Sequence, residues 1–164
     1  MDKIDISVVI PIYNEAKNIR ELYDRLLASI TSISPRYELI FIDDGSTDNS
    51  FKVLKDLRSK DKKISILKFT RNFGQQSAVL AGFKRCQGKT IVQLDADLQN
   101  PPEEIPKLIR KLDEGYDIVS GIRKNRQDFF LREICSSFLA FLVSKLMGKN
   151  ISLDISSFRV MRRS

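Results

Sequence analysis

Two aspartates one residue apart, Asp95 and Asp97, are the residues of this sequence best suited to chemistry. They end the apolar run of QLDADLQ, and Gln99 follows two residues later. Carboxylates at i and i+2 beyond the end of a strand can turn to the same side and hold Mg²⁺ or Mn²⁺, leaving positions open for phosphate oxygens. The amide of Gln99 could add an oxygen or orient a ligand. The alternative is structural, because aspartates also cap the turn into a following helix.

The residues after this pair have a simpler interpretation. Pro101 and Pro102 fit the first turn of a helix, and Glu103 and Glu104 complement the positive end of its dipole. They predict a helix start and require no function.

A second acidic pair, Asp43 with Asp44, stands in IDDGSTD. Adjacent aspartates at a strand end could accept hydrogen bonds from a base or a ribose. A turn is the alternative: Asp44 or Ser46 would shape it, and Ser46 or Thr47 would cap the next helix. The residues alone leave both interpretations open.

The elements that must position these acids alternate along the chain. Apolar runs predict strands at 4–12, 37–43, 64–69, 90–95 and 116–122. Helical spacing predicts a helix after each of the first four, the first capped by Asn14 with Glu15, the second from Phe51, the third over 75–85 and the fourth over 101–115. This order predicts an α/β fold with a mostly parallel sheet and helices on both faces. Ligands should therefore bind in the loops after Ile12, Ile42, Phe69 and Leu94.

Several chemistries are excluded by what the sequence lacks. No GxGxxG follows the first strand and no GxxxxGK[ST] occurs, so a divalent cation is the natural partner for a bound phosphate. Histidine is absent, which removes His-based acid and base catalysis. Cys86 and Cys135 form no CxxC motif, which favours a reducing compartment.

The net charge of +7 over 164 residues is unevenly spread. Residues 1–121 hold 19 Lys and Arg against 18 Asp and Glu, whereas residues 122–164 hold 9 against 3. A basic region favours an anionic partner, which could be nucleic acid, a phospholipid headgroup or a phosphorylated substrate, although a solvated basic face is the simple alternative. The length predicts one domain with a substantial core.

The apolar stretches are too short to cross a membrane. The N-terminal run has about six residues. The longest uncharged run within 128–148 extends from Ile134 to Ser144, about half the length that a membrane span needs. Phe129, Phe130 and Leu131 beside Arg126 and Arg132 favour a helix lying at the membrane interface over one packed only in the core.

Taken in order, a set of stretches covering residues 5–163 resembles the family 2 glycosyltransferases of the Rossmann-like GT-A fold: PIYNE, DDGSTD, RNFGQQSAVLAGF, LDADLQNPPEEIP, GYDIVSGIRKNRQD and FRVMRR. Within that family the chain resembles the polyprenyl-phosphate glycosyltransferases, which include dolichyl-phosphate mannose synthase. The stretch around DLQNPPEEIP is most similar to undecaprenyl-phosphate aminoarabinose transferases, with the glucose transferases in the same group.

The resemblance implies an activity. A sugar would move with inversion from a UDP- or GDP-linked donor to a polyprenyl phosphate, with Mg²⁺ or Mn²⁺, at the cytoplasmic face of a membrane to which the full-length protein is anchored. Nucleic acid is then not needed as a partner, and a homo-oligomer is compatible with this activity. An acceptor phosphate is already ionised at neutral pH, so the lack of histidine is no obstacle.

The resemblance also implies residue roles, carried over motif by motif. Asp97 and Arg123 would be catalytic. Arg132 and Ser136, one helical turn apart, would bind the acceptor phosphate together with Arg123. Asp95, Asp97 and Gln99 would hold the metal and diphosphate. The nucleotide sugar would contact Pro11, Tyr13, Glu15, Asp43, Asp44, Asn72 and Asp95.

The resemblance further implies a single GT-A catalytic domain over 1–164, truncated at its C-terminus. Residues 1–121 would bind the nucleotide sugar, and 122–164 would begin the acceptor and membrane-interface half. One departure stands near the end: Ser156 and Ser157 precede Phe158, where many relatives carry a glycine and often an acid. Two alternatives remain, namely a saccharide hydroxyl acceptor, which would need a carboxylate base, and a non-catalytic nucleotide-sugar-binding domain.

Overall fold

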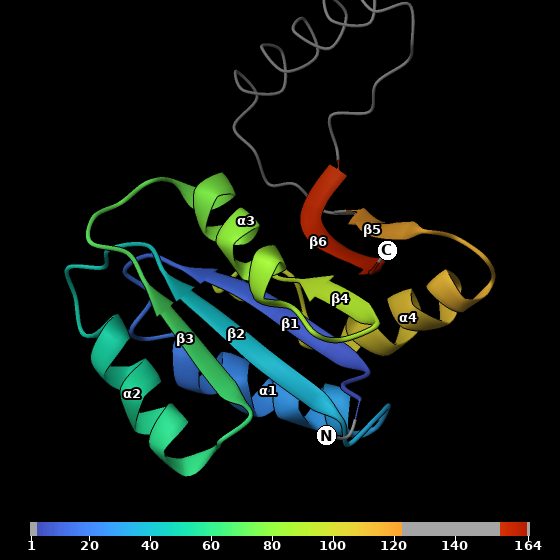
Figure 1. The fold of residues 1–164 in the computed structure, drawn as a ribbon, viewed down its shortest axis with the longest axis horizontal. Helices are drawn as coiled ribbons and strands as arrows, with labels where there is room; N and C mark the ends of the chain where they lie inside the picture. The colour runs from blue at the N-terminus through green and yellow to red at the C-terminus, as the bar shows by residue number, and fades with distance from the viewer. Residues whose placement is uncertain (1–2, 123–154, 164) are drawn as a thin grey trace, which may run out of the picture.

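The computed structural model describes residues 3–122 and 155–163, which form one sheet covered by helices (Figure 1). The six strands lie in the order β3-β2-β1-β4-β6-β5. Their bounds are β1 Ile6–Ile12, β2 Tyr37–Asp43, β3 Ile64–Lys68, β4 Thr90–Gln93, β5 Ile118–Ile122 and β6 Ile155–Arg162. The helices are α1 Ile19–Thr31, α2 Ser50–Lys60, α3 Gln75–Arg85, the short 3₁₀ helix η1 Pro102–Glu104, and α4 Ile105–Asp113.

Strands β1 to β4 form the parallel part of the sheet. β1 and β2 are buried along nearly their whole length, as expected for continuous apolar runs covered on both faces. Alternate side chains enter two cores: Val8 and Ile10 pack with α1, whereas Val9 packs with Ala78 of α3. The predicted α/β fold with helices on both faces is therefore confirmed.

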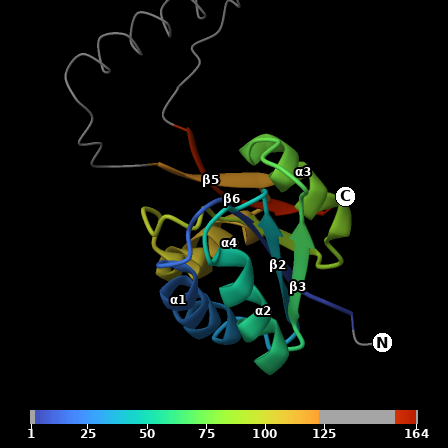
Figure 2. The same cartoon turned by 90° about the vertical axis from the view of Figure 1, so that its left-hand side faces the viewer.

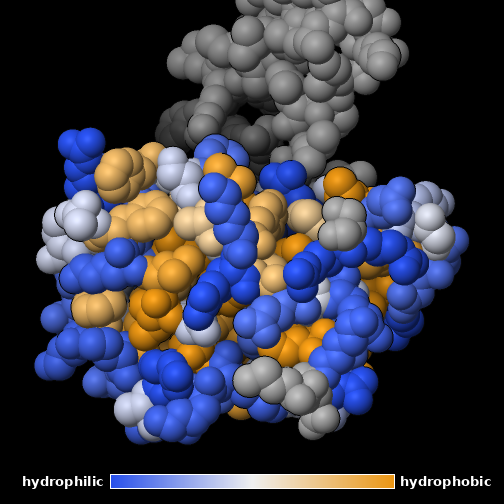
Figure 3. All heavy atoms as spheres, viewed as in Figure 1, coloured by the Kyte–Doolittle hydropathy of each residue, from blue (hydrophilic) through white to orange (hydrophobic). Residues whose placement is uncertain are grey.

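The two faces are covered unequally. Among the described elements α3 lies on one face, and α1, α2 and α4 lie on the other (Figures 1 and 2). On the face seen in Figure 3, apolar side chains show between hydrophilic ones, since one helix cannot cover that whole face. Leu80 of α3 itself is 55% exposed.

The end of the sheet was only partly predicted. β5 forms as expected but does not continue the parallel order, because β6 lies between β4 and β5 and pairs antiparallel with both. Val160 of β6 stands opposite Val92 of β4 and Val119 of β5. The stretch FRVMRR, which contributed only to the family resemblance, is thus a central strand.

Most element bounds agree with the sequence prediction, and α3 matches it at both ends. The cap of α1 was predicted wrongly: the helix begins at Ile19, and Asn14 adopts a left-handed backbone with φ 57°. The cap of α2 was also wrong, since its N-cap residue is Asn49 and not Ser46 or Thr47. Gly115, with φ 111°, ends the fourth helix as predicted.

None of the helices in the described ranges has the length and apolar character needed to cross a membrane.

Candidate active site

A cavity of about 290 Å³ opens where the carboxyl ends of β1, β2 and β4 meet. This is the place where ligands bind in open α/β sheets. Its lining includes most of the nucleotide-sugar and metal residues predicted from the sequence, together with residues that were not predicted. The full lining is Pro11, Ile12, Tyr13, Glu15, Asp44, Asn72, Gln75, Asp95, Ala96 and Asp97.

Asp95 is held from two sides. The side-chain amide of Gln75 donates to its Oδ1 at 2.6 Å. The hydroxyl of Ser157 donates to its Oδ2. Neither donor was predicted as a site residue. Gln75 could have been suspected from its place at the start of the helix after the third loop, but nothing local in the sequence points from Ser157 to Asp95.

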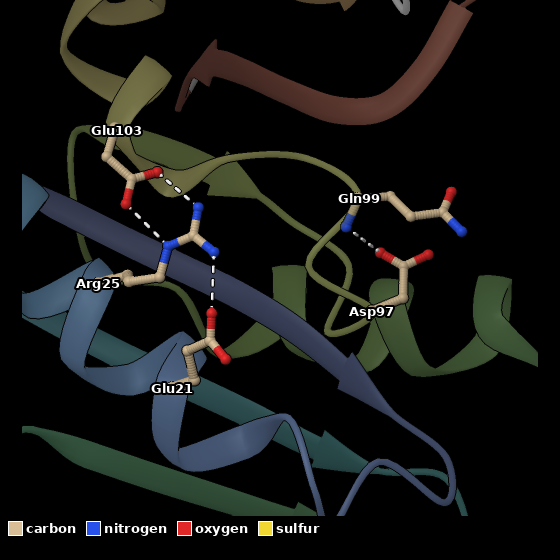
Figure 4. Close-up of polar contacts among 5 residues, drawn as sticks. All are labelled: Glu21, Arg25, Asp97, Gln99 and Glu103. Atoms are coloured by element: carbon tan, nitrogen blue, oxygen red, sulfur yellow. Dashed lines mark hydrogen bonds and ion pairs between the residues drawn. The ribbon is translucent and has the colours of Figure 1, made fainter. Parts of the chain in front are cut away.

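Asp97 is held within its own loop. The backbone N–H of Gln99 donates to Asp97 Oδ1 at 3.0 Å (Figure 4). The turn between them depends on Leu98, whose φ of 60° is rare for a bulky residue. Gln99 is not among the cavity residues and reaches Asp97 through its backbone, so an amide ligand role for its side chain stays a prediction.

The donor set fits a hard divalent cation. Within the described residues no cluster of three or more Asp, Glu, His or Cys forms a complete cage. Two carboxylates facing one cavity are nevertheless what Mg²⁺ uses when it keeps waters and takes its remaining oxygens from substrate phosphates. Asp95 and Asp97 would hold such an ion.

Asp44 joins two of the loops that border the cavity. It is buried, and its carboxylate accepts the backbone N–H of Phe73 at 2.8 Å and of Gly74 at 2.9 Å. Asn72 reinforces this loop, since its Oδ1 also accepts from Gly74 at 2.9 Å. Asp44 therefore lines the cavity and also holds the loop at its edge, and this structural role does not depend on a bound ligand.

Asp43 lies deeper than predicted. It is fully buried and is not among the cavity residues. Its Oδ1 accepts the backbone N–H of Ser46 at 3.1 Å, while within the described ranges its Oδ2 has no hydrogen-bond partner. This bond closes a turn through the side chain of Asp43, whereas the turn interpretation assigned the turn to Asp44 or Ser46. A contact of Asp43 with the base or ribose stays a prediction.

The loop after β1 is tied to the loop after β2. Asn14 Oδ1 accepts the backbone N–H of Thr47 at 2.8 Å, and the backbone N–H of Asn14 donates to the Ser46 hydroxyl at 3.0 Å. Glu15 lines the cavity, and its carboxylate accepts from Asn18 at 2.6 Å. These bonds explain why Asn14 adopts its unusual backbone: it bridges two loops and does not cap a helix.

The predicted acceptor residues Arg123, Arg132 and Ser136 lie outside the described residues, as does the predicted interfacial stretch 128–148. In the described part of the sheet, Gln93 of β4 stands opposite Arg159 of β6 in the antiparallel register. In the described ranges Gln93 Oε1 and Arg159 Nε are buried without hydrogen-bond partners. The sequence did not predict that Gln93 and Arg159 lie opposite each other, because this arrangement depends on where β6 enters the sheet.

The sequence is similar to that of a bacterial transferase. It is 42% identical over 159 residues to the undecaprenyl-phosphate 4-deoxy-4-formamido-L-arabinose transferase of Proteus mirabilis, covering 96% of this chain and 49% of the relative. The chain thus spans about half the length of that protein. The predicted resemblance to the polyprenyl-phosphate group is confirmed by this similarity.

Solved structures share the fold at lower identity. Glucosyl-3-phosphoglycerate synthase of Mycobacterium tuberculosis, in complex with Mn²⁺, UDP and phosphoglyceric acid, superposes with a TM-score of 0.71 at 19% identity, covering 97% of this chain and 56% of that one. A mannosyltransferase of Pyrobaculum calidifontis in complex with GDP-Man and Mn²⁺ gives 0.65 at 21% identity, covering 74% and 36%. Both likenesses concern the fold.

The sequence pattern of the family described as glycosyl transferase family 2 matches residues 7–164, which is nearly the whole chain. The match includes β2, β4 and all of β1 except its first residue. Sequence pattern and fold therefore agree that this chain belongs to glycosyl transferase family 2 and has the GT-A fold.

Proposed function

We propose that this chain binds a nucleotide-diphosphate sugar with Mg²⁺ or Mn²⁺ and transfers the sugar, with inversion, to a polyprenyl phosphate. The observation that carries the proposal is the meeting of Asp95 and Asp97 in one cavity with residues from the ends of β1 and β2. A nucleotide diphosphate needs residues that pack against its base and a cation that balances the charge of its phosphates. The residues after β1 would do the first, and the two aspartates with their cation would do the second.

The residues of the cavity would divide the work. Pro11, Tyr13 and Glu15 follow β1 and would contact the base and ribose, together with Asn72. Asp44 would contact the donor through the loop that it holds. Asp95 and Asp97 would hold the cation, which when bound stabilises the charge of the departing diphosphate as a Lewis acid.

In the transfer step, an oxygen of the acceptor phosphate attacks the anomeric carbon of the sugar from the side opposite the diphosphate. A bond forms between that carbon and the phosphate oxygen. The bond from the same carbon to the β-phosphate oxygen breaks, and the nucleoside diphosphate leaves with the electron pair. A phosphate monoester is largely ionised at neutral pH because its second pKa is about 6. No general base has to remove a proton.

The acceptor half of the proposal is supported by the Proteus mirabilis relative, whose name specifies undecaprenyl phosphate. The donor half is supported by the GDP-Man, UDP and Mn²⁺ bound to the solved neighbours. Arg123, Arg132 and Ser136 would align the acceptor phosphate, since arginine binds phosphate oxygens in a bidentate manner. The reaction would take place at the cytoplasmic face of a membrane, whose anionic headgroups attract basic residues.

Calorimetry tests the donor half. UDP and GDP are titrated into the chain with Mn²⁺ and with a chelator. At least one nucleotide is expected to bind only with Mn²⁺, and Asp97→Ala should abolish that binding. Asp113→Ala, an exposed aspartate at the end of α4, is the matched control and should bind as the wild type does. Metal-independent binding, or equal binding by Asp97→Ala, would contradict the proposal.

Transfer of labelled sugar tests the acceptor half. Label is expected to appear in undecaprenyl phosphate and not in a saccharide acceptor. Label in the saccharide would show a hydroxyl acceptor instead. Metal-dependent nucleotide binding without transfer to either acceptor would show a binding domain that does not catalyse.

A further inference from the structure

We propose that Gln75 and Ser157 are positioning residues, which hold the carboxylate of Asp95 in the orientation that donor binding requires. The inference deepens the proposed function and rests on it. Neither residue belongs to the acidic motif, and each reaches Asp95 from a distant part of the sequence.

The two donors take one carboxylate oxygen each. Gln75, the first residue of α3, donates to Oδ1 from 20 positions away in the sequence at 2.6 Å. Ser157, near the start of β6, donates to Oδ2 from 62 positions away. Asp95 itself stands two residues beyond the end of β4. Its carboxylate is therefore held between a helix that packs on β1 and β2 and the strand next to its own.

Two donors on opposite oxygens fix the plane of a carboxylate, which otherwise rotates broadly about its last side-chain bond. An ionised carboxylate offers about four lone-pair sites. Each oxygen of Asp95 therefore keeps capacity to contact a cation or a donor hydroxyl. Because the carboxylate is already fixed, less conformational entropy is lost when the ligand binds, and the free energy of binding is more favourable. Outer partners of metal ligands act in the same manner.

The elements that carry the donors are themselves anchored. The start of α3 is held by the bonds from Phe73 and Gly74 to Asp44. β6 pairs with β4 in an antiparallel register that places Gln93 opposite Arg159. Asp95 lies two residues after Gln93, and Ser157 lies two residues before Arg159, so this register brings them to the same end of the strand pair. Both donors thus belong to regular elements, of which α3 is held at its start by the Asp44 carboxylate and β6 by the backbone bonds of the sheet.

Asp97 is held differently. Its hydrogen bond comes from the backbone N–H of Gln99 in the same turn, at 3.0 Å. The turn would keep this contact even if α3 or β6 shifted, whereas the contacts of Asp95 would be lost. The two carboxylates should therefore respond differently to substitutions in α3 and β6.

The test measures Mn²⁺-dependent nucleotide affinity by calorimetry in the whole chain. Gln75→Leu and Ser157→Ala should each weaken binding by about 10-fold or more, the range found for outer partners of metal ligands. Ser157→Thr keeps the hydroxyl and should restore affinity. Two matched controls should leave the nucleotide affinity unchanged: Gln76→Leu at the next residue of α3, and Ser120→Ala on β5. Thermal unfolding confirms that each variant folds.

Gln75 also lines the cavity and could contact the ligand directly, so a double-mutant cycle decides the route. If Gln75 acts through Asp95, the losses from Gln75→Leu and Ser157→Ala should not add in the double variant, because both donors act on one carboxylate. Losses that add would overturn the positioning role.

A measurement without metal or ligand completes the test. The side-chain amide protons of Gln75 should exchange slowly in NMR spectra of the wild type. In Asp95→Ala they should exchange as fast as those of Gln76, because both side chains are exposed and the bond to Asp95 is what sets Gln75 apart. Fast exchange in the wild type would overturn the contact.

The outcomes separate the two proposals. Absence of metal-dependent nucleotide binding by the wild type would overturn the proposed function and this inference with it. Binding by the wild type, together with unchanged affinity in Gln75→Leu and Ser157→Ala, would overturn the inference alone.

Discussion

Arg25 of α1 forms a bidentate ion pair with Glu103 of η1, with Nε to Oε1 at 2.8 Å and Nη2 to Oε2 at 2.9 Å (Figure 4). A second contact from Arg25 reaches Glu21 one helical turn earlier at 3.2 Å. The helix start after the DADLQ loop is thereby attached to α1. The simple interpretation of Glu103, as a complement to the helix dipole, was incomplete because its partner lies 78 positions away.

Glu103→Gln should lower the free energy of unfolding at pH 7 by at most about 1 kcal/mol, because the pair is partly exposed. The hydrogen bond from Arg25 lowers the pKa of Glu103 below its ordinary 4.5. A depressed folded pKa gives stability that is present above the unfolded pKa and is lost as pH falls through the folded value. Thermal unfolding by circular dichroism from pH 8 to 3 should show wild type and variant converging at low pH. Glu104→Gln, which breaks the more exposed pair with Lys107, is the control.

Gly45→Ala should strongly destabilise the loop that borders the cavity. Gly45 has φ 71°, and a Cβ there would lie 2.4 Å from the backbone carbon of Arg71. Strain and overlap with backbone together should cost about 2 to 4 kcal/mol. Gly115→Ala is the matched control, because φ is also positive but nothing lies within 4 Å. Urea denaturation should show the larger loss for Gly45→Ala, and equal losses would contradict the close approach.

Gly82→Ala should destabilise the protein although alanine favours helix. A Cβ at Gly82 would lie 2.4 Å from Val9 Cγ1 and 2.8 Å from Ile42 Cδ1, at the seam between α3 and the sheet. Overpacking of a core costs about 1 to 3 kcal/mol, whereas the gain in helix propensity is about 1. Denaturation with urea measures the balance. A more stable variant would show that α3 is free to shift away from the sheet.

Cys86 should be unreactive in the folded protein. It is buried, and burial raises the pKa of its thiol to about 11. The thiolate is the reacting form, so at pH 8 its fraction falls about 100-fold relative to a thiol with a pKa of 9. A thiol reagent should modify a Cys135→Ser variant slowly in buffer and rapidly in urea. Rapid reaction of the folded variant would contradict the burial.

The prediction of elements from the sequence succeeded where the signal is local. Helical spacing within QQSAVLAGFKR placed α3 at both ends, and apolar runs placed β1 and β2 to within two residues. It failed at Asn14, whose type suits a helix cap equally well. The competing partner, the 46–48 loop, is more than 30 positions away and is not visible in a short window.

The sequence by itself determined the α/β order, the polar residues at the ends of the strands, and the family to which the chain belongs. These follow from side-chain period, local turn chemistry and motif spacing, all of which act over a few residues. Only the tertiary structure decided that β6 enters the sheet beside β4, that Asp43 is buried and does not line the cavity, and that Gln75 and Ser157 meet at Asp95. Such contacts depend on which strands pair and in what register, because a hydrogen bond requires two groups within about 3 Å regardless of their distance in the sequence.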